Sequence, residues 1–142
     1  MDKTQDKDCI FCQIIAGEMP AYVIHETDEI LVFLSLENHP LVIPKKHYRD
    51  LYDLDQKLGG QIIAKTAQVA QATKQALKAD ATKILQLNGS AAGQIVFHLH
   101  FHVYPCYEGK SPLQTDNQSA AYKQKLVTQI KTELDKLKGL SI

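Results

Sequence analysis

Residues 93–105 read GQIVFHLHFHVYP, with a histidine at every second position in the middle. The β-branched and aromatic residues of this stretch predict one long strand over 94–104 that ends at Pro105. Side chains alternate between the two faces of a strand, so we expect the histidines on one face and the intervening apolar residues against a hydrophobic core. The histidines are His98, His100 and His102, and the apolar residues are Leu99, Phe101 and Val103.

The spacing of the histidines favours nucleophilic chemistry over a metal site built from all three. On a straight strand, successive histidines lie about 6.6–6.8 Å apart and the outer two about 13 Å apart, so at most two can bind one ion. An accessible imidazole is largely neutral at pH 7 and offers a lone pair without further activation. The run therefore predicts attack on the phosphorus of a small phosphate ester, anhydride or phosphoramidate, with a covalent phosphohistidine-type intermediate. A neighbouring histidine can assist the leaving group.

A loop of small residues precedes the histidines. Residues 88–94 read NGSAAGQ, and the glycines let backbone N–H groups approach an anion closely. Gln94 adds a side-chain amide. A loop of this composition is by itself most often a simple turn, but its position next to the histidines predicts phosphate binding.

Apolar patterns on both sides of this stretch predict one α+β domain. Short apolar runs rich in β-branched residues predict strands, and longer segments with apolar residues at helical spacing predict helices. Their order favours an antiparallel sheet with helices packed on it. The predicted helices cover residues 9–16, 55–79 and 119–138, and the predicted strands cover residues 22–25, 30–34, 41–43, 83–87 and 94–104.

Length and charge restrict the classes of function. The chain has 142 residues, the size of one domain, and its 16 Lys+Arg balance 16 Asp+Glu, so no basic field attracts a nucleic acid polymer. The first eight residues are polar, and no apolar stretch approaches the roughly 18 residues of a membrane-spanning helix. We therefore expect one soluble cytoplasmic domain. Its phosphate site must be formed by a few neighbouring residues, because the chain has no net positive charge.

Two of the three cysteines form the segment Cys9-Ile10-Phe11-Cys12. In a reducing compartment this spacing indicates metal or redox chemistry, because a two-residue gap lets both thiolates reach one tetrahedral zinc ion. The other ligands must come from elsewhere in the fold. The alternative is a pair of free thiols, with Cys12 buried on a helix.

Residues 93–103 resemble the signature of the histidine triad (HIT) family of nucleotide hydrolases and transferases. Two further segments are similar to family landmarks in the same order, namely residues 9–20, CIFCQIIAGEMP, and residues 41–47, LVIPKKH. The resemblance implies a homodimer built on an extended antiparallel sheet, with the α-phosphate of a nucleotide against the histidines. It divides the chain into a flexible tail (1–8), the HIT domain (9–110), and a C-terminal loop with an amphipathic helix packed on the same domain (111–142).

The resemblance also implies roles for individual residues. By position, His100 is the nucleophile that becomes nucleotidylated, while His102 and Gln94 support the phosphate and the leaving group beside His98. The residues expected to contact substrate are Gly93, Gln94, Asn88, Ser90, His39 and Ser35. Family members with the N-terminal Cys-x-x-Cys can bind zinc through residues that correspond here to Cys9, Cys12, His47 and His98. Four protein ligands would make that zinc structural rather than catalytic.

Several positions depart from the family pattern around the nucleoside. Ser35 stands where an acidic residue usually meets the ribose hydroxyls, and the following loop is contracted so that His39 alone matches. The usual phosphate-contacting asparagine falls on Leu87, with Asn88 one place later, and Cys106 stands where an arginine is common. These changes spare the nucleophile and alter the nucleoside pocket.

Three functions stay open from the sequence. The first is a hydrolase or transferase acting at the α-phosphate of a nucleoside phosphoramidate or dinucleoside polyphosphate through His100. The second is a nucleotide-binding module of the same fold with weakened or lost turnover. The third is hydrolysis by water that zinc activates directly.

Overall fold

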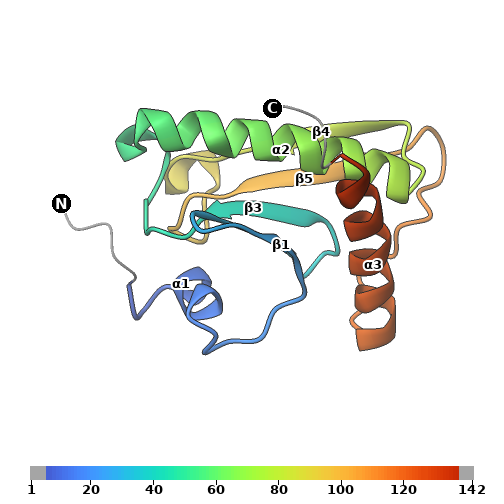
Figure 1. The fold of residues 1–142 in the computed structure, drawn as a ribbon, viewed down its shortest axis with the longest axis horizontal. Helices are drawn as coiled ribbons and strands as arrows, with labels where there is room; N and C mark the ends of the chain where they lie inside the picture. The colour runs from blue at the N-terminus through green and yellow to red at the C-terminus, as the bar shows by residue number, and fades with distance from the viewer. Residues whose placement is uncertain (1–5, 138–142) are drawn as a thin grey trace.

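The strands of the computed structural model, which describes residues 6–137, form one antiparallel sheet in the order β1-β2-β3-β5-β4 (Figure 1). The predicted α+β class is confirmed, because three helices pack on this sheet. The strands are β1 (Val23–Glu26), β2 (Ile30–Leu34), β3 (Pro40–Pro44), β4 (Ala81–Leu85) and β5 (Phe101–Cys106), and the helices are α1 (Ile10–Ile15), α2 (Gln56–Ala76) and α3 (Ala120–Lys136).

Both faces of the sheet are covered, which explains why β2 and β3 are apolar at every position and wholly buried. Val32 and Val42 face the main core, which α2 and α3 complete. Leu31 and Phe33 alternate with these residues and point to a second core, where they meet Phe11 of α1. In Figure 1, α2 runs along one side of the sheet and α1 lies on the other.

Polar side chains begin each helix. The side chains of Cys9, Asp55 and Ser119 accept hydrogen bonds from backbone N–H groups in the first turns of α1, α2 and α3, respectively. The predicted amphipathic helix at the C-terminal end of the chain is confirmed as α3. Its inward residues that join the main core are Leu126, Val127, Ile130 and Leu134.

The predicted strand over 94–104 is wrong in its first half, because β5 begins only at Phe101. Residues 96–98 form a bend, and the amide of Gln94 holds this irregular segment by donating to the carbonyl oxygens of Arg49 and Val96. The predicted burial of Leu99, Phe101 and Val103 in a core is confirmed.

β5 also continues past its predicted end, through Pro105 to Cys106. Pro105 pairs with Thr82 of β4, whereas β3 pairs with β5 only at Phe101 and His102. Among the described residues, Pro105 lies beyond the part of β5 that pairs with β3, near the end of the strand, where proline is tolerated.

The other element boundaries differ by a few residues. The strand predicted over 83–87 lies at Ala81–Leu85, and the helix predicted over 55–79 ends at Ala76. Residues 1–5 of the predicted tail and Lys138 of the predicted last helix lie outside the described residues. Within residues 6–137, no helix has the length and hydropathy needed to cross a bilayer.

Candidate functional site

Four predicted metal ligands come together at the N-terminal end of α1. The ligand atoms of Cys9, Cys12, His47 and His98 all lie within 4.8 Å of one another. Nδ1 of His98 is 3.4 Å from Cys9 Sγ, 3.5 Å from Cys12 Sγ and 3.2 Å from His47 Nδ1, and Cys12 Sγ is 3.3 Å from that same nitrogen of His47. Tetrahedral zinc, with bonds of about 2.0–2.3 Å, would space nitrogen and sulfur ligands about 3.3–3.8 Å apart. The cluster fits such an ion.

The hydrogen bonds of His98 leave the correct nitrogen for a metal. Its Nε2–H donates to the carbonyl oxygen of Pro44 at 2.8 Å, so the lone pair is on Nδ1, which faces the two thiols. A ligating histidine that donates its other N–H to a carbonyl is the usual arrangement in metal sites. Burial lowers the pKa of His98 to about 4, so this imidazole is neutral at pH 7.

Burial shifts the pKa of the Cys12 thiol away from the charged form as well, which for a thiol means upward. It raises the pKa of Cys12 to about 11, so this residue is a thiol when no cation is bound. A bound metal would remove that proton, because the thiolate is the ligand form.

His100 is oriented by His98, which is also one of the four residues of the candidate metal site. Its Nδ1–H donates to the backbone carbonyl oxygen of His98 at 2.7 Å, which leaves the lone pair on Nε2. Phe11 of α1 packs its ring against both imidazoles, with centroid distances of 5.2 Å to His100 and 5.9 Å to His98. Burial also lowers the pKa of His100. Its Nε2 is therefore unprotonated at neutral pH and suited to nucleophilic attack.

The prediction that the three histidines share one face of a straight strand is wrong. His98 lies in the bend before β5, and its side chain is fully buried in the metal-ligand cluster. His100 and His102 remain neighbours, with ring centroids 4.9 Å apart. The bend thus divides the run into one candidate metal ligand and a pair of histidines.

A chain of hydrogen bonds fixes the orientation of His102. Ser35 Oγ accepts the backbone N–H groups of Glu37 and His39, each at 3.2 Å, so its hydroxyl hydrogen is left for Nδ1 of His39 at 3.0 Å. His39 then carries its proton on Nε2 and donates it to Nδ1 of His102 at 2.9 Å. His102 is therefore protonated on Nε2 when it is neutral.

Both of these histidines resist a second proton. Burial, and to a smaller extent the charges that neighbouring histidines can carry, lowers the pKa of His39 to about 3 and that of His102 to about 4. At pH 7 the pair is uncharged, which preserves the hydrogen-bond directions.

Sequence reasoning missed two residues beside this pair. Tyr104 stacks on His102 with ring centroids 5.4 Å apart, lies 4.0 Å from the ring of His39, and brings its hydroxyl within 3.3 Å of Nδ1 of His102. Lys83 of β4 places Nζ 4.8 Å from the centre of the tyrosine ring. The available signal was the period of two in β5, because Tyr104 follows His102 on the same face.

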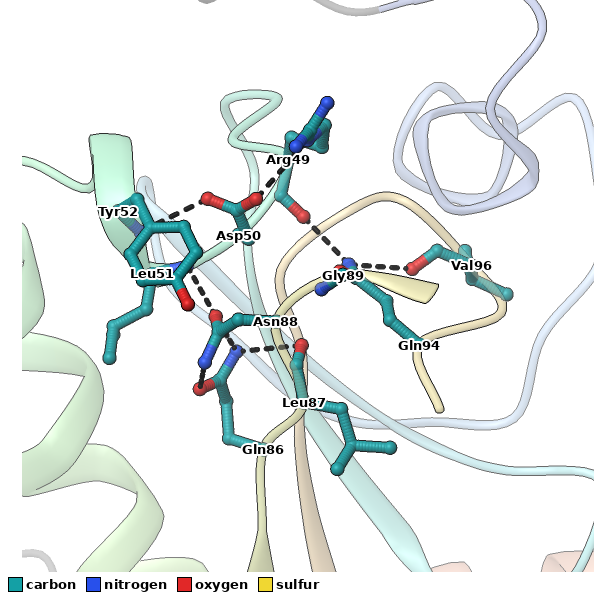
Figure 2. Close-up of polar contacts among 10 residues, drawn as sticks. All are labelled: Arg49, Asp50, Leu51, Tyr52, Gln86, Leu87, Asn88, Gly89, Gln94 and Val96. Carbon is teal, nitrogen blue, oxygen red and sulfur yellow. Dashed lines mark hydrogen bonds and ion pairs between the residues drawn. The ribbon is translucent and has the colours of Figure 1, made fainter. Parts of the chain in front are cut away.

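The predicted phosphate loop is held by its own polar side chains (Figure 2). Gln94 Oε1 accepts the N–H of Gly89 at 2.7 Å. Asn88 Oδ1 accepts the N–H of Leu51 at 2.8 Å, and Asn88 exchanges two further hydrogen bonds with the amide of Gln86. These contacts tie the loop to residues 49–52, and substrate contacts by Asn88 and Gln94 stay predictions.

The turn within this loop retains free donors. Ser90–Ala92 form one 3-10 turn, which closes at Gly93 with a φ of 100° that favours glycine. The N–H groups of Ser90 and Ala91 donate to no residue in the described part of the chain. They are therefore available to an anion, as is the exposed side chain of Ser90.

Comparison with known proteins identifies the family. A model of the HIT domain matches residues 16–109. The chain belongs to the histidine triad family. A histidine triad nucleotide-binding protein from Sulfolobus tokodaii superposes with a TM-score of 0.86 at 32% identity, covering 92% of this chain and 94% of that one.

Two other relatives bear on the chemistry of the family. A zinc-bound histidine triad protein from Mycobacterium smegmatis superposes with a TM-score of 0.83 at 31% identity, covering 94% of this chain and 98% of that one. The adenylylsulfatase HINT3 of Arabidopsis thaliana is 36% identical over 106 residues, which are 72% of this chain and 54% of the relative. Proteins of this family are generally hydrolases or transferases.

Proposed function

We propose that this protein is a nucleotide hydrolase or transferase that acts at the α-phosphate of a nucleoside phosphoramidate or a dinucleoside polyphosphate. The observation that carries the proposal is the fixed orientation of His100, whose Nδ1–H is held by the carbonyl of His98 so that Nε2 keeps its lone pair. The family of the chain and the name of its adenylylsulfatase relative support chemistry at a nucleotide phosphorus.

The proposed reaction has two steps. Nε2 of His100 attacks the α-phosphorus, the bond from phosphorus to the leaving nitrogen or oxygen breaks, and the nucleotide is carried on the histidine. The Nε2–H of His102, the nitrogen that the bond from His39 leaves protonated, donates a hydrogen bond to the departing atom, which leaves with the electron pair of the broken bond and takes a proton from solvent. Water or another acceptor then attacks phosphorus, the bond to His100 breaks with its electron pair returning to Nε2, and the proton of the acceptor passes to solvent.

The loop before β5 is the proposed phosphate support. The free N–H groups of Ser90 and Ala91 can donate to phosphate oxygens, and Gly93 keeps the backbone close. Ser35 is a weaker candidate for the ribose, because its hydroxyl is engaged with His39.

We infer that zinc is held by Cys9, Cys12, His47 and His98. A tetrahedral ion with four protein ligands has no open position, so its contribution is structural and would join α1 to the segment that carries the nucleophile. This favours the nucleophilic mechanism over hydrolysis by zinc-activated water.

A homodimer is proposed through the outer edge of β4. Within residues 6–137 this strand pairs only with β5, and it exposes Ile84, so its outer backbone groups can continue the sheet into a second copy. Light scattering after gel filtration is expected to give twice the chain mass for the wild type and one chain mass for Ile84→Lys. A wild type that stays monomeric at micromolar concentration contradicts this arrangement.

The decisive experiment traps the covalent intermediate. The protein is mixed with an aryl nucleoside phosphoramidate, quenched within milliseconds, and examined by mass spectrometry for a nucleotidyl group on His100. The control variant His25→Gln is expected to form the adduct, and His100→Gln is not. Tight nucleotide binding by the wild type with neither adduct nor product would support the alternative, a nucleotide-binding module without turnover.

A further inference from the structure

The turn between β2 and β3 depends on one buried asparagine. Asn38 is fully buried and has a φ of 71°, in the left-handed region that asparagine tolerates better than most residues. Its N–H donates to the carbonyl oxygen of Ser35 at 3.0 Å, while the N–H of Ser35 donates to the carbonyl oxygen of His39 at 2.8 Å. The backbone that presents His39 is therefore built around Asn38.

Every polar atom of this side chain is bound to the C-terminal part of the protein. Asn38 Nδ2 donates to the carbonyl oxygens of Gln114 at 2.7 Å and Asn117 at 2.9 Å. Its Oδ1 accepts from Nζ of Lys123, at 2.6 Å. These partners lie 76 to 85 residues further along the chain, so they restrain the turn from outside the sheet.

Lys123 is an unusual residue for this position. It lies in the first turns of α3 and is 5% exposed. Among the described residues, no carboxylate lies within ion-pair distance of its amino group. Burial lowers the pKa of this amine. Burying a lysine amine without a counter-ion costs free energy of folding. Stability alone therefore does not account for the hydrogen bond from Lys123 to Asn38.

The contact between His39 and His102 suggests a reason for the buried lysine. His39 is the next residue after Asn38, and its Nε2–H is the donor that meets Nδ1 of His102. A rotation of the turn would lengthen that bond beyond its present 2.9 Å, because the ring of His39 moves with the backbone of the turn.

We propose that Lys123 and Asn38 are positioning residues, through which the C-terminal segment 114–123 holds His39 against His102. The catalytic consequence rests on the proposed function, because it matters only if His102 donates a hydrogen bond to a leaving group. The positioning itself can be tested without any substrate.

The first experiment observes the proton between the two histidines by NMR with histidine labelled by ¹⁵N. The Nε2–H of His39 is expected to be protected from exchange with water in the wild type. Protection is expected to fall at least ten-fold in Lys123→Met and in Asn38→Gly, which keeps the positive φ but removes all three side-chain bonds. Lys131→Met, which changes an exposed lysine of the same helix, is the matched control.

An internal reference separates positioning from general loosening of the fold. The Nε2–H of His98, held by the carbonyl of Pro44, is expected to stay protected in every variant. Unchanged protection of the His39 proton in both Lys123→Met and Asn38→Gly overturns the proposal. Equal loss of protection at His39 and His98 also overturns it, since the role would then be only structural.

The second experiment measures turnover of the aryl nucleoside phosphoramidate. The two variants are expected to lower kcat about ten-fold with KM within two-fold of the wild type, because binding groups are untouched while the hydrogen-bond donor to the leaving group is misplaced. If the wild type shows no turnover, the proposed function fails, and the NMR result still decides the positioning role. Loss of His39 protection with unchanged kcat overturns the catalytic consequence.

Discussion

The buried His39 predicts a specific dependence of stability on pH. Its side chain is 2% exposed, and burial lowers its pKa to about 3 from the ordinary value of 6.5 that applies in the unfolded chain. Acid therefore protonates the unfolded state before the folded one. The stability that this residue contributes is complete above pH 6.5 and is lost as the pH falls from 6.5 toward 3.

The size of the effect follows from the two pKa values. Between pH 7 and pH 4.5, linkage predicts a loss of about 2.5 kcal/mol from His39 alone, with a slope near 1.4 kcal/mol per pH unit below pH 6. The variant His39→Gln keeps an amide that can donate to His102 but cannot be protonated.

Urea unfolding at pH 7 and pH 4.5, in the presence of a chelator that removes metal, measures the difference. His39→Gln is expected to lose about 2.5 kcal/mol less stability than the wild type over this range, whereas the control His25→Gln retains the His39 contribution. Equal losses in the wild type and His39→Gln would refute the reasoning, because they would mean that His39 accepts a proton in the folded state as readily as in the unfolded one.

Four further outcomes are expected. His100→Gln lowers phosphoramidate turnover by at least about 1000-fold with little change in thermal midpoint, because in the proposed mechanism this residue supplies the reacting nitrogen; steady-state kinetics and calorimetry measure the two effects. Zinc at 100 times its Kd raises the thermal midpoint by about 5–10 °C, from about 2.7 kcal/mol of linked stability, and Cys12→Ser abolishes the rise in differential scanning fluorimetry. Phe11→Leu lowers kcat about ten-fold while zinc stoichiometry, measured by atomic absorption, stays at one. Leu99→Ala costs about 2–5 kcal/mol in urea unfolding, because the leucine is fully buried.

The sequence predicted the sheet and its helices because their signals are local. The continuous apolar runs of β2 and β3 and the helical spacing in α3 identify these elements without knowledge of their neighbours. The bend before β5 was missed because it depends on the amide of Gln94, which binds the carbonyl of Arg49, a residue 45 positions away. No local pattern contains that contact.

The candidate site was also predicted only in part from the sequence. The grouping of Cys9, Cys12, His47 and His98, which the family resemblance implied, is present in the structure. The hydrogen-bond network that orients His39 and His102 was not predicted, because it joins the β2–β3 turn to residues of α3 and of the loop before it. Such contacts follow from tertiary packing, and a single sequence carries no periodic trace of them.

The side chain and the backbone of His98 have separate partners, which has a consequence for substitutions at this position. The side chain of this residue lies in the candidate metal site, while its backbone carbonyl accepts a hydrogen bond from His100 and orients that ring. Any amino acid supplies a carbonyl at this position, whereas only a few supply a metal ligand. Replacement of the His98 side chain would therefore remove a candidate metal ligand without removing the carbonyl that orients His100.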